Sequence, residues 1–213
     1  MLISRSQRIC HLITTSLILG ERISNATITG NKFAMTKVCV YCGLSSGKNP
    51  IYLEQAKILA QVMVQRNFTL IYGGAKIGLM GAIADVILEQ GGSVIGVIPK
   101  YISLKFPEMV HSGLTKLHVV ESMHERKALM FDLADIFIAL PGGLGTIEEI
   151  LEVFTWSKMG IHNKPCGLLN TLGYYNDLLS FFDRCVNEQF LKPEHRSILV
   201  VEEDILRLFE KLS

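Results

Sequence analysis

The sequence predicts an α/β protein with a doubly wound, parallel sheet of about seven strands and helices on both faces. Three observations support this prediction. Short apolar segments alternate with longer amphipathic ones, several short segments such as residues 136–140 are apolar at consecutive positions, and glycine-rich turns follow three of them. Consecutive apolar residues are typical of strands that are covered on both faces. Regular alternation of strand and helix implies right-handed crossovers and therefore a parallel sheet.

The expected elements follow one another from residue 38 to the end of the chain. Strands are expected at residues 38–42, 69–72, 93–98, 116–120, 135–140, 165–169 and 198–201. Helices are expected at residues 50–66, 79–90, 122–134, 146–159, 175–188 and 202–212. The first of these helices begins with a proline, which is favoured in a first turn, and its apolar residues recur at the spacing of one buried helix face.

Length and composition favour one core. The chain has 213 residues, of which 49% are hydrophobic and 19% are charged, so it offers ample apolar surface for one domain of medium or large size. We therefore expect a single Rossmann-like domain over residues 35–213. The formal net charge of +1 gives no general attraction to nucleic acid or anionic lipid. Neither a nucleic-acid nor a membrane partner is expected.

The first 34 residues differ from the rest of the chain. They carry a formal charge of +3, which leaves −2 for residues 35–213, and polar residues interrupt their apolar segment 9–19. That segment is too short and too polar to span a bilayer, and no convincing signal-peptide cleavage site follows it. We expect residues 1–34 to be a disordered extension or an over-long start, with Met35 as the natural beginning. A signal peptide and an organelle-type transit segment are the alternatives.

The five cysteines, an odd number without framework spacing, favour a reducing compartment, and a cytoplasmic protein is expected. Cys39 and Cys42 form a C-x-x-C motif inside an expected strand. A strand turns these two side chains to opposite faces, so we expect them to pack in the core rather than to serve redox chemistry or a metal. The histidines show no ligand spacing, so no metal and no other cofactor is expected.

Glycine-rich turns follow three of the expected strands, at residues 42–47, 72–81 and 140–146. Ligands of doubly wound sheets bind beyond the carboxyl ends of the strands, where these turns would lie. None of the turns is a G-x-G-x-x-G fingerprint or a P-loop, so neither a dinucleotide nor a triphosphate is indicated. Three glycine turns at strand-to-helix junctions nevertheless predict a cradle for a phosphate or a nucleotide.

The third of these turns continues as Pro141-Gly-Gly-Leu-Gly-Thr-Ile-Glu-Glu149. The free N–H groups at the start of the following helix can hold a phosphate without a lysine. Glu149 stands three residues after Thr146, so a capping box, in which Glu149 only satisfies the amide of Thr146, is an equal alternative to a chemical role. Glu148 can likewise be a solvated acid of the first turn.

A second segment, Ser-Met-His-Glu-Arg-Lys at residues 122–127, also begins an expected helix just after a strand. It places Arg126 and Lys127 near the helix N-terminus, where cations oppose the helix dipole. An anionic ligand is the natural compensation, and Arg126 can present a planar fork to a phosphate. The alternative is that both residues are ordinary surface charges.

These segments closely resemble the Lonely Guy family of cytokinin-activating phosphoribohydrolases. Residues 141–149 match the family's hallmark P-G-G-x-G-T-x-x-E without departure, and the resemblance covers nearly all of residues 37–212. It includes Tyr-Gly-Gly at 72–74, Met-His-x-Arg-Lys at 123–127 and Gly-Tyr-Tyr at 173–175. The resemblance therefore implies a phosphoribohydrolase on a Rossmann-like fold.

The same resemblance implies which residues act, with Arg126 and Glu149 as the catalytic pair. The residues implied to bind the substrate are Gly73, Gly74, Glu108, Arg126, Lys127, Gly142, Gly143, Leu144, Gly145, Thr146, Ile147, Glu148, Glu149 and Thr155. Ala75 replaces a glycine that is usual in the family, a departure that affects the details of its loop. Family members assemble as dimers, so a homodimer is implied.

The implied reaction is hydrolysis of the N-glycosidic bond of cytokinin riboside 5′-monophosphates, N6-prenylated AMP, which releases the free base and ribose 5-phosphate. A carboxylate such as Glu149 can stabilise oxocarbenium character on the ribose and orient or deprotonate the attacking water. Arg126 can anchor the phosphate or neutralise the departing base. A broader AMP or purine 5′-monophosphate nucleosidase and a non-catalytic nucleotide-binding protein are the alternatives.

Proteins of this family also carry the label lysine decarboxylase. That reaction needs pyridoxal phosphate on a lysine, and the His-Lys pair typical of such sites is absent from the sequence.

Overall fold

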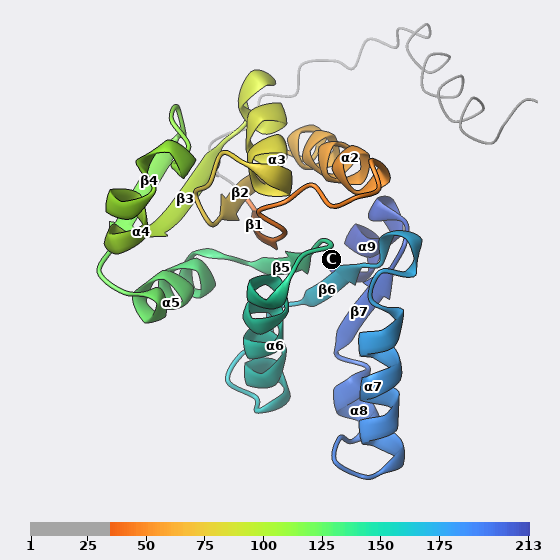
Figure 1. Cartoon of the computed structure of the whole chain (residues 1–213). Helices are drawn as coiled ribbons and strands as arrows, with labels where there is room; N and C mark the ends of the chain where they lie inside the picture. Colours follow the sequence, from red (N-terminus) through yellow and green to blue (C-terminus); the bar gives the residue numbers. More distant parts are fainter. Residues whose placement is uncertain (1–34) are drawn as a thin grey trace, which may run out of the picture. The chain divides into compact units, whose positions relative to one another are not determined.

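A seven-stranded, all-parallel sheet runs through the part of the chain that the computed structural model describes, residues 35–213 (Figure 1). The strands are β1 (Lys37–Tyr41), β2 (Thr69–Tyr72), β3 (Val94–Pro99), β4 (Lys116–Val120), β5 (Ile136–Ala139), β6 (Cys166–Leu169) and β7 (Leu199–Glu202). The predicted parallel sheet is confirmed, and each strand begins and ends within one residue of its predicted position. The expectations for residues 1–34 lie outside the described residues.

The strand order β4-β3-β2-β1-β5-β6-β7 places β1 beside β5 in the middle of the sheet. From β1 the chain builds outward to β4 on one side, then returns and builds outward to β7 on the other. Val38 pairs with Ile136 in register, and Tyr41 pairs with Ala139. The carboxyl ends of β1 and β5 therefore form the switch point of the sheet, the place where doubly wound folds bind their ligands.

Helices cover both faces of the sheet. Their bounds are α2 (Ile51–Gln65), α3 (Gly78–Glu89), α4 (Lys100–Lys105), α5 (Met123–Leu133), α6 (Leu144–Lys158), α7 (Asn176–Asn187), α8 (Pro193–Arg196) and α9 (Ile205–Lys211), with two 3₁₀ turns, η1 (Pro107–Met109) and η2 (Thr171–Gly173). Among these described helices, none is long and apolar enough to cross a membrane.

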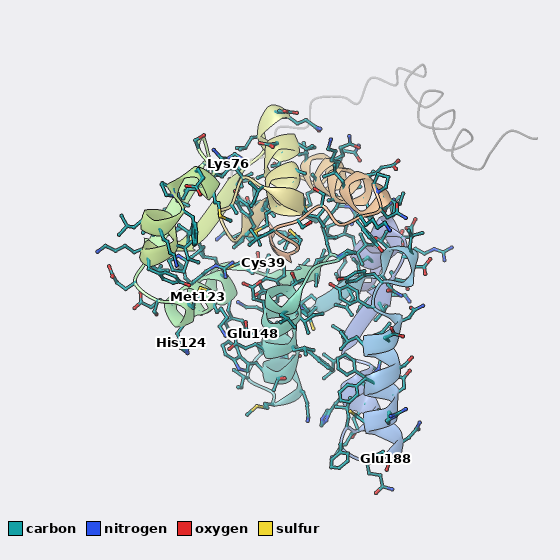
Figure 2. The ribbon with its side chains drawn as sticks, in the orientation of Figure 1. Cys39, Lys76, Met123, His124, Glu148 and Glu188 are labelled. Atoms are coloured by element: carbon teal, nitrogen blue, oxygen red, sulfur yellow. The ribbon has the colours of Figure 1, made fainter. Side chains whose placement is uncertain are left out.

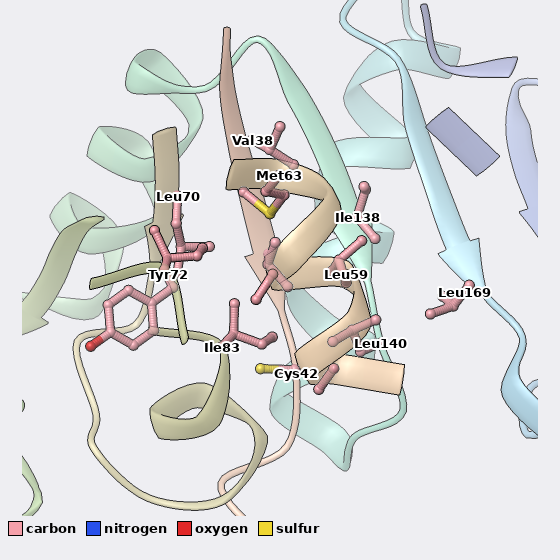
Figure 3. Packing of buried hydrophobic residues seen from close by; sticks show 14 of the residues in the cluster. Val38, Cys42, Leu59, Met63, Leu70, Tyr72, Ile83, Ile138, Leu140 and Leu169 are labelled. Carbon is pink, nitrogen blue, oxygen red and sulfur yellow. The ribbon is translucent and has the colours of Figure 1, made fainter. Parts of the chain in front are cut away.

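Two hydrophobic clusters hold the helical layers against the sheet. One joins α2, α3 and α9 to the sheet face that carries Val38 and Ile138, with Leu59 and Ile83 fully enclosed between helix and sheet (Figure 3). The other joins α5, α6 and α7 to the opposite face, around Phe137. The strands between the two layers are covered on both sides, which explains why they are apolar at consecutive positions.

The two cysteines of the C-x-x-C motif pack on opposite faces of the sheet, as predicted. Cys39 belongs to the cluster under α5 and α6, and Cys42 belongs to the cluster under α2 and α3 (Figure 3). Both are free and buried, and burial raises the pKa of each thiol well above its usual range. A thiol that stays protonated in an apolar core is a packing residue.

The helices differ from prediction mainly at their ends. The last helix begins at Ile205 instead of residue 202, because Glu202 still pairs with Leu169 at the end of β7. Asp204 then caps the helix by accepting a hydrogen bond from the amide of Arg207, with 2.9 Å between oxygen and nitrogen. The short elements α4, α8, η1 and η2 were not predicted, since three to six residues are too few to show a helical period.

Removal of one core side chain tests this packing. Leu59 is fully buried between α2 and the sheet. Because Leu59→Ala leaves a cavity that the rigid sheet cannot fill, we expect it to lower the free energy of unfolding by about 2–5 kcal/mol in urea denaturation. Lys57→Ala, two residues away on the exposed side of α2, is the matched control and should change it by less than about 0.5 kcal/mol. Equal losses in both variants would contradict the packing.

Candidate active site

A cavity of about 570 Å³ lies beyond the carboxyl ends of β1, β2, β3 and β5. Its volume is within the range of about 300–1,000 Å³ that small-molecule sites occupy. The lining residues are Cys42, Gly43, Leu44, Ser45, Ser46, Gly47, Tyr52, Gly73, Ala75, Leu79, Met80, Ile98, Pro99, Ile102, Met109, Met123, Arg126, Pro141, Gly142, Gly143, Gly145, Thr146, Glu149 and Tyr174. All three glycine-rich turns that follow strands therefore contribute to one site.

The turn between β5 and α6 presents unused backbone amides to this cavity. Gly143 is the N-cap of α6, and the first bond inside the helix runs from the amide of Ile147 to the carbonyl of Gly143, at 3.1 Å. In the described chain, the amides of residues 143–146 have no acceptor. A helix start with free N–H groups at a cavity wall is suited to bind a phosphate.

Gly142 keeps this turn tight. A Cβ atom at this position would lie 2.1 Å from Oγ1 of Thr146 and 2.9 Å from the amide nitrogen of Gly43. Thr146 is buried and lines the cavity. Glycine at position 142 therefore allows the β5–α6 turn, the threonine and the β1 turn to pack directly against one another.

The capping alternative for Glu149 is wrong. Because α6 begins at Leu144 with Gly143 as its cap, Thr146 is already inside the helix and cannot be the capping residue. Glu149 lies one turn further along and is only 6% exposed. Its carboxylate faces Arg126 across the cavity wall.

Arg126 and Glu149 form a buried ion pair. Nη1 of Arg126 lies 2.7 Å from Oε1 of Glu149, and Arg126 is itself only 8% exposed. Nε of Arg126 donates a hydrogen bond to the carbonyl of Val97 in β3, at 3.2 Å. Both predicted catalytic residues line the cavity, and the alternative that Arg126 is a surface charge is wrong.

Gly73, directly after β2, makes room for the guanidinium. A Cβ atom on Gly73 would lie 2.5 Å from Nη2 of Arg126. The absence of a side chain at this position lets Arg126 cross the strand ends toward Glu149. Gly73 is thus needed for the geometry of the ion pair.

Burial and the neighbouring Arg126 shift the pKa of Glu149 in opposite directions. Burial raises the pKa of the Glu149 carboxyl above its ordinary value, and the Arg126 guanidinium acts against this increase. The cost of removing a carboxylate from water is the larger effect, so the pKa remains raised. A carboxylate with a raised pKa is a stronger base, which suits a group that accepts a proton from water.

Lys127 points to other acids. Its Nζ lies 2.5 Å from Oε1 of Glu148 and 3.1 Å from Oε1 of Glu152, and the hydrogen bond to Glu148 raises the pKa of the lysine. Glu148 projects from α6, and Met123 and His124 mark the start of α5 (Figure 2). This pairing ties α5 to α6 beside the Arg126–Glu149 pair.

The structure brings only some of the predicted substrate-binding residues to the cavity wall. Those that line it are Gly73, Arg126, Gly142, Gly143, Gly145, Thr146 and Glu149. Those outside the lining are Gly74, Glu108, Lys127, Leu144, Ile147, Glu148 and Thr155. Of these, Glu108 on η1 and Leu144, Glu148 and Thr155 on α6 are exposed.

Sequence reasoning missed two aromatic residues of the site. Tyr52 in the first turn of α2 and Tyr174 after η2 line the cavity and meet edge to face, with ring centroids 5.6 Å apart. Tyr174 is part of the Gly-Tyr-Tyr segment that carries the resemblance, but nothing in the sequence shows that this segment returns to the β5 turn. In residues 35–213 no cluster of three or more His, Cys, Asp or Glu side chains could hold a metal ion.

The fold and the site together define a doubly wound α/β protein with free backbone amides in the glycine-rich turn at its switch point. A family model described as "Possible lysine decarboxylase" matches residues 80–212. Cytokinin riboside 5′-monophosphate phosphoribohydrolase from Rhodococcoides fascians is 49% identical over 79% of this chain and 84% of its own length. Cytokinin riboside 5′-monophosphate phosphoribohydrolase LOG5 from Arabidopsis thaliana is 48% identical over 85% of this chain and 78% of its own length. The chain belongs to the family of these phosphoribohydrolases, and the resemblance to the Lonely Guy proteins is confirmed.

Solved structures show the same fold at low identity. The molybdenum cofactor carrier protein from Chlamydomonas reinhardtii superposes with a TM-score of 0.64 at 19% identity, over 84% of this chain and 98% of that protein. The molybdenum cofactor binding protein from Rippkaea orientalis gives 0.62 at 19% identity, over 84% of this chain and 96% of that protein. At this identity the likeness supports the fold alone.

Titration of Glu149 tests the electrostatics of the pair. We expect carboxyl carbon NMR to give Glu149 a pKa above its ordinary value of 4.5. In Arg126→Met this pKa should rise further, because the cation that opposes the burial effect is lost. Arg184→Met, which removes an exposed cation on α7, is the control and should leave the pKa unchanged. A pKa of Glu149 at or below 4.5, or a decrease in Arg126→Met, would contradict this description.

Proposed function

We propose that residues 35–213 hydrolyse the N-glycosidic bond of cytokinin riboside 5′-monophosphates, releasing free-base cytokinin and ribose 5-phosphate. The observation that carries the proposal is the buried Arg126–Glu149 pair, 2.7 Å apart, on the wall of a cavity that three residues with free amides, Gly143, Gly145 and Thr146, also line. Relatives at 48–49% identity carry this activity in their names.

The first step is to fix the substrate by its phosphate. The amides of residues 143–146 and the positive end of the α6 dipole bind the 5′-phosphate. Two charges on the phosphate are thereby held without a lysine on the cavity wall. The bound phosphate positions the ribose against Glu149, so that the reacting carbon and the acid meet in one orientation.

Glu149 then supports cleavage of the bond between C1′ and the base nitrogen. As that bond breaks, its electron pair goes to the base and positive charge develops on C1′ and the ring oxygen. The Glu149 carboxylate stabilises this charge and accepts a proton from the water whose oxygen bonds to C1′. Arg126 keeps Glu149 ionised and oriented, and its remaining N–H groups are available to the phosphate or to the departing base. The base takes up one proton from solvent, and Glu149 returns to solvent the proton that it accepted from the attacking water, so that the carboxylate is regenerated.

The apolar side of the cavity is suited to bind the prenyl chain of a prenylated base. Leu79, Met80, Ile98, Ile102 and Met109 line it, and methionines adapt to irregular apolar groups. An N6-isopentenyl chain would bury its methyl groups there, each buried CH₂ contributing about 0.8 kcal/mol. Plain AMP would leave this surface without a partner.

A decarboxylase mechanism has little support in the same cavity. Pyridoxal phosphate chemistry requires a lysine to form the Schiff base. Among the described residues that line the cavity, none is a lysine. The family's descriptive label therefore does not match the side chains that this chain places at its site.

Parallel assays with isopentenyladenosine monophosphate, AMP and GMP test the function. We expect free base to be released fastest from isopentenyladenosine monophosphate, because the apolar side of the cavity can bury its prenyl chain. Equal rates with all three would favour a broader purine monophosphate nucleosidase. Tight binding without base release would favour a nucleotide carrier, and both results would overturn the proposal.

The role of Glu149 is tested by Glu149→Gln. The amide keeps the shape but cannot take a proton, so kcat should fall by at least about two orders of magnitude while the Kd for the monophosphate stays within a few-fold. In the wild-type protein, activity should fall as the pH drops through the raised pKa of Glu149, and this acidic limb should vanish in the variant. Glu188→Gln, beyond the end of α7 (Figure 2), is the control. Undiminished turnover in Glu149→Gln would refute the role.

We further propose that the protein works in the cytoplasm as a homodimer. All four cysteines of the described chain are free, which suits a reducing compartment. The resemblance implies that the helix after the P-G-G motif lies near the dimer interface. This helix, α6, exposes Leu144 by 89%, and Met159, directly after its end, is exposed by 66%. Light scattering should give twice the mass of one chain, and Leu144→Glu should shift the population toward monomers. A monomeric wild-type protein would contradict the assembly.

A further inference from the structure

Three consecutive carbonyl groups of the β5–α6 turn are held by donors outside the turn. The carbonyl of Leu140 accepts from the hydroxyl of Tyr175 at 2.5 Å, that of Pro141 from the amide of Gly43 at 3.2 Å, and that of Gly142 from the hydroxyl of Tyr174 at 2.7 Å. Two of the three donors are thus adjacent tyrosines from a distant part of the chain. No role in the reaction has so far been given to them.

The tyrosines are held in place by a rigid connection after β6. Asn170 is buried, its side-chain oxygen accepts from the amide of Tyr175 at 2.7 Å, and its side-chain nitrogen donates to Asn176 at 2.9 Å. Between Asn170 and Tyr175, Leu172 adopts a left-handed backbone with φ 56°, a conformation that costs a non-glycine residue free energy. Such a conformation persists where its surroundings determine it, so the tyrosines sit on a fixed support.

The bond from Tyr174 matters because of the peptide it holds. A peptide group is planar, so fixing the direction of the Gly142 carbonyl also fixes the direction of the Gly143 N–H on the opposite side. This peptide joins two glycines, whose backbones rotate with little steric resistance. If it turned over, a carbonyl oxygen would replace an N–H among the amides that face the cavity, and an anion would be repelled.

We infer that Tyr174 is a positioning residue, which selects the orientation of the Gly142–Gly143 peptide in which the turn binds phosphate. Its ring lines the cavity and packs against Tyr52 and Tyr175, with centroids 5.6 and 5.0 Å apart, which holds the hydroxyl at the Gly142 carbonyl. Tyr175 serves a different purpose. It holds the Leu140–Pro141 peptide, which has no N–H to present. The inference rests on the proposed function only in taking the phosphate of a nucleotide as the ligand.

The test is Tyr174→Phe, which removes the hydroxyl and keeps the ring. We expect KM for isopentenyladenosine monophosphate and the calorimetric Kd for ribose 5-phosphate to rise about fivefold, the effect of one lost hydrogen bond. The value of kcat should stay within about twofold, and so should kcat/KM for the riboside without phosphate. A merely structural role would weaken both substrates alike.

Two variants serve as controls. Tyr175→Phe should lower the melting temperature, because the Leu140 carbonyl is left unpaired, without changing the preference for the phosphorylated substrate. Tyr101 is an exposed tyrosine on α4 outside the cavity. Tyr101→Phe should change neither the melting temperature nor the preference for the phosphorylated substrate. An unchanged preference in Tyr174→Phe, or an equal loss of preference in Tyr175→Phe, would overturn the inference.

Failure of the inference can be told apart from failure of the proposed function. The Kd for ribose 5-phosphate is measured by calorimetry and does not depend on turnover. If the wild-type protein released no base from any nucleotide, the proposed function would fail. The Kd for ribose 5-phosphate of the wild-type protein, compared with that of Tyr174→Phe, would still decide the role of Tyr174.

Discussion

The ion pair between Arg126 and Glu149 is the interaction on which the site depends. Both groups are buried, and a buried charge without its partner costs about 3–5 kcal/mol. The fold therefore has to bring the two side chains together. The carbonyl of Val97 accepts from the arginine, and the bare Gly73 leaves room for its guanidinium. Residues at the ends of β2 and β3 thus position Arg126 beside Glu149.

The order of the strands explains how this meeting is possible. Helix α5 follows β4 at the edge of the sheet and leads back to β5 in the middle, so it crosses one face of the sheet over the intervening strands β3, β2 and β1. Helix α6 starts directly after β5, at the switch point. One crossover thus delivers Arg126, and the next turn delivers both Glu149 and the free amides. The groups proposed to bind phosphate and to react share a cavity because both follow from this single return of the chain.

Much of this could be predicted from the sequence. Strands covered on both faces are apolar at consecutive positions, so segments such as 136–140 identified the sheet, and the P-G-G motif identified the turn. Short elements such as α4 could not be predicted, because six residues without a buried side chain carry no period. Glu149 was ambiguous because a capping box and a catalytic acid share one pattern, and only the start of α6 at Leu144 separates them. Tyr174 was missed because its hydrogen bond joins residues 32 positions apart.

A double-mutant cycle tests most directly whether Arg126 and Glu149 act as one unit. The measurement is kcat/KM for isopentenyladenosine monophosphate in wild-type, Arg126→Met, Glu149→Gln and double-variant proteins, with melting curves to confirm that each is folded. If Arg126 acts by keeping Glu149 ionised and oriented, the double variant should lose about as much as the worse single variant. Losses that multiply would show that the two residues act independently, and would contradict the account.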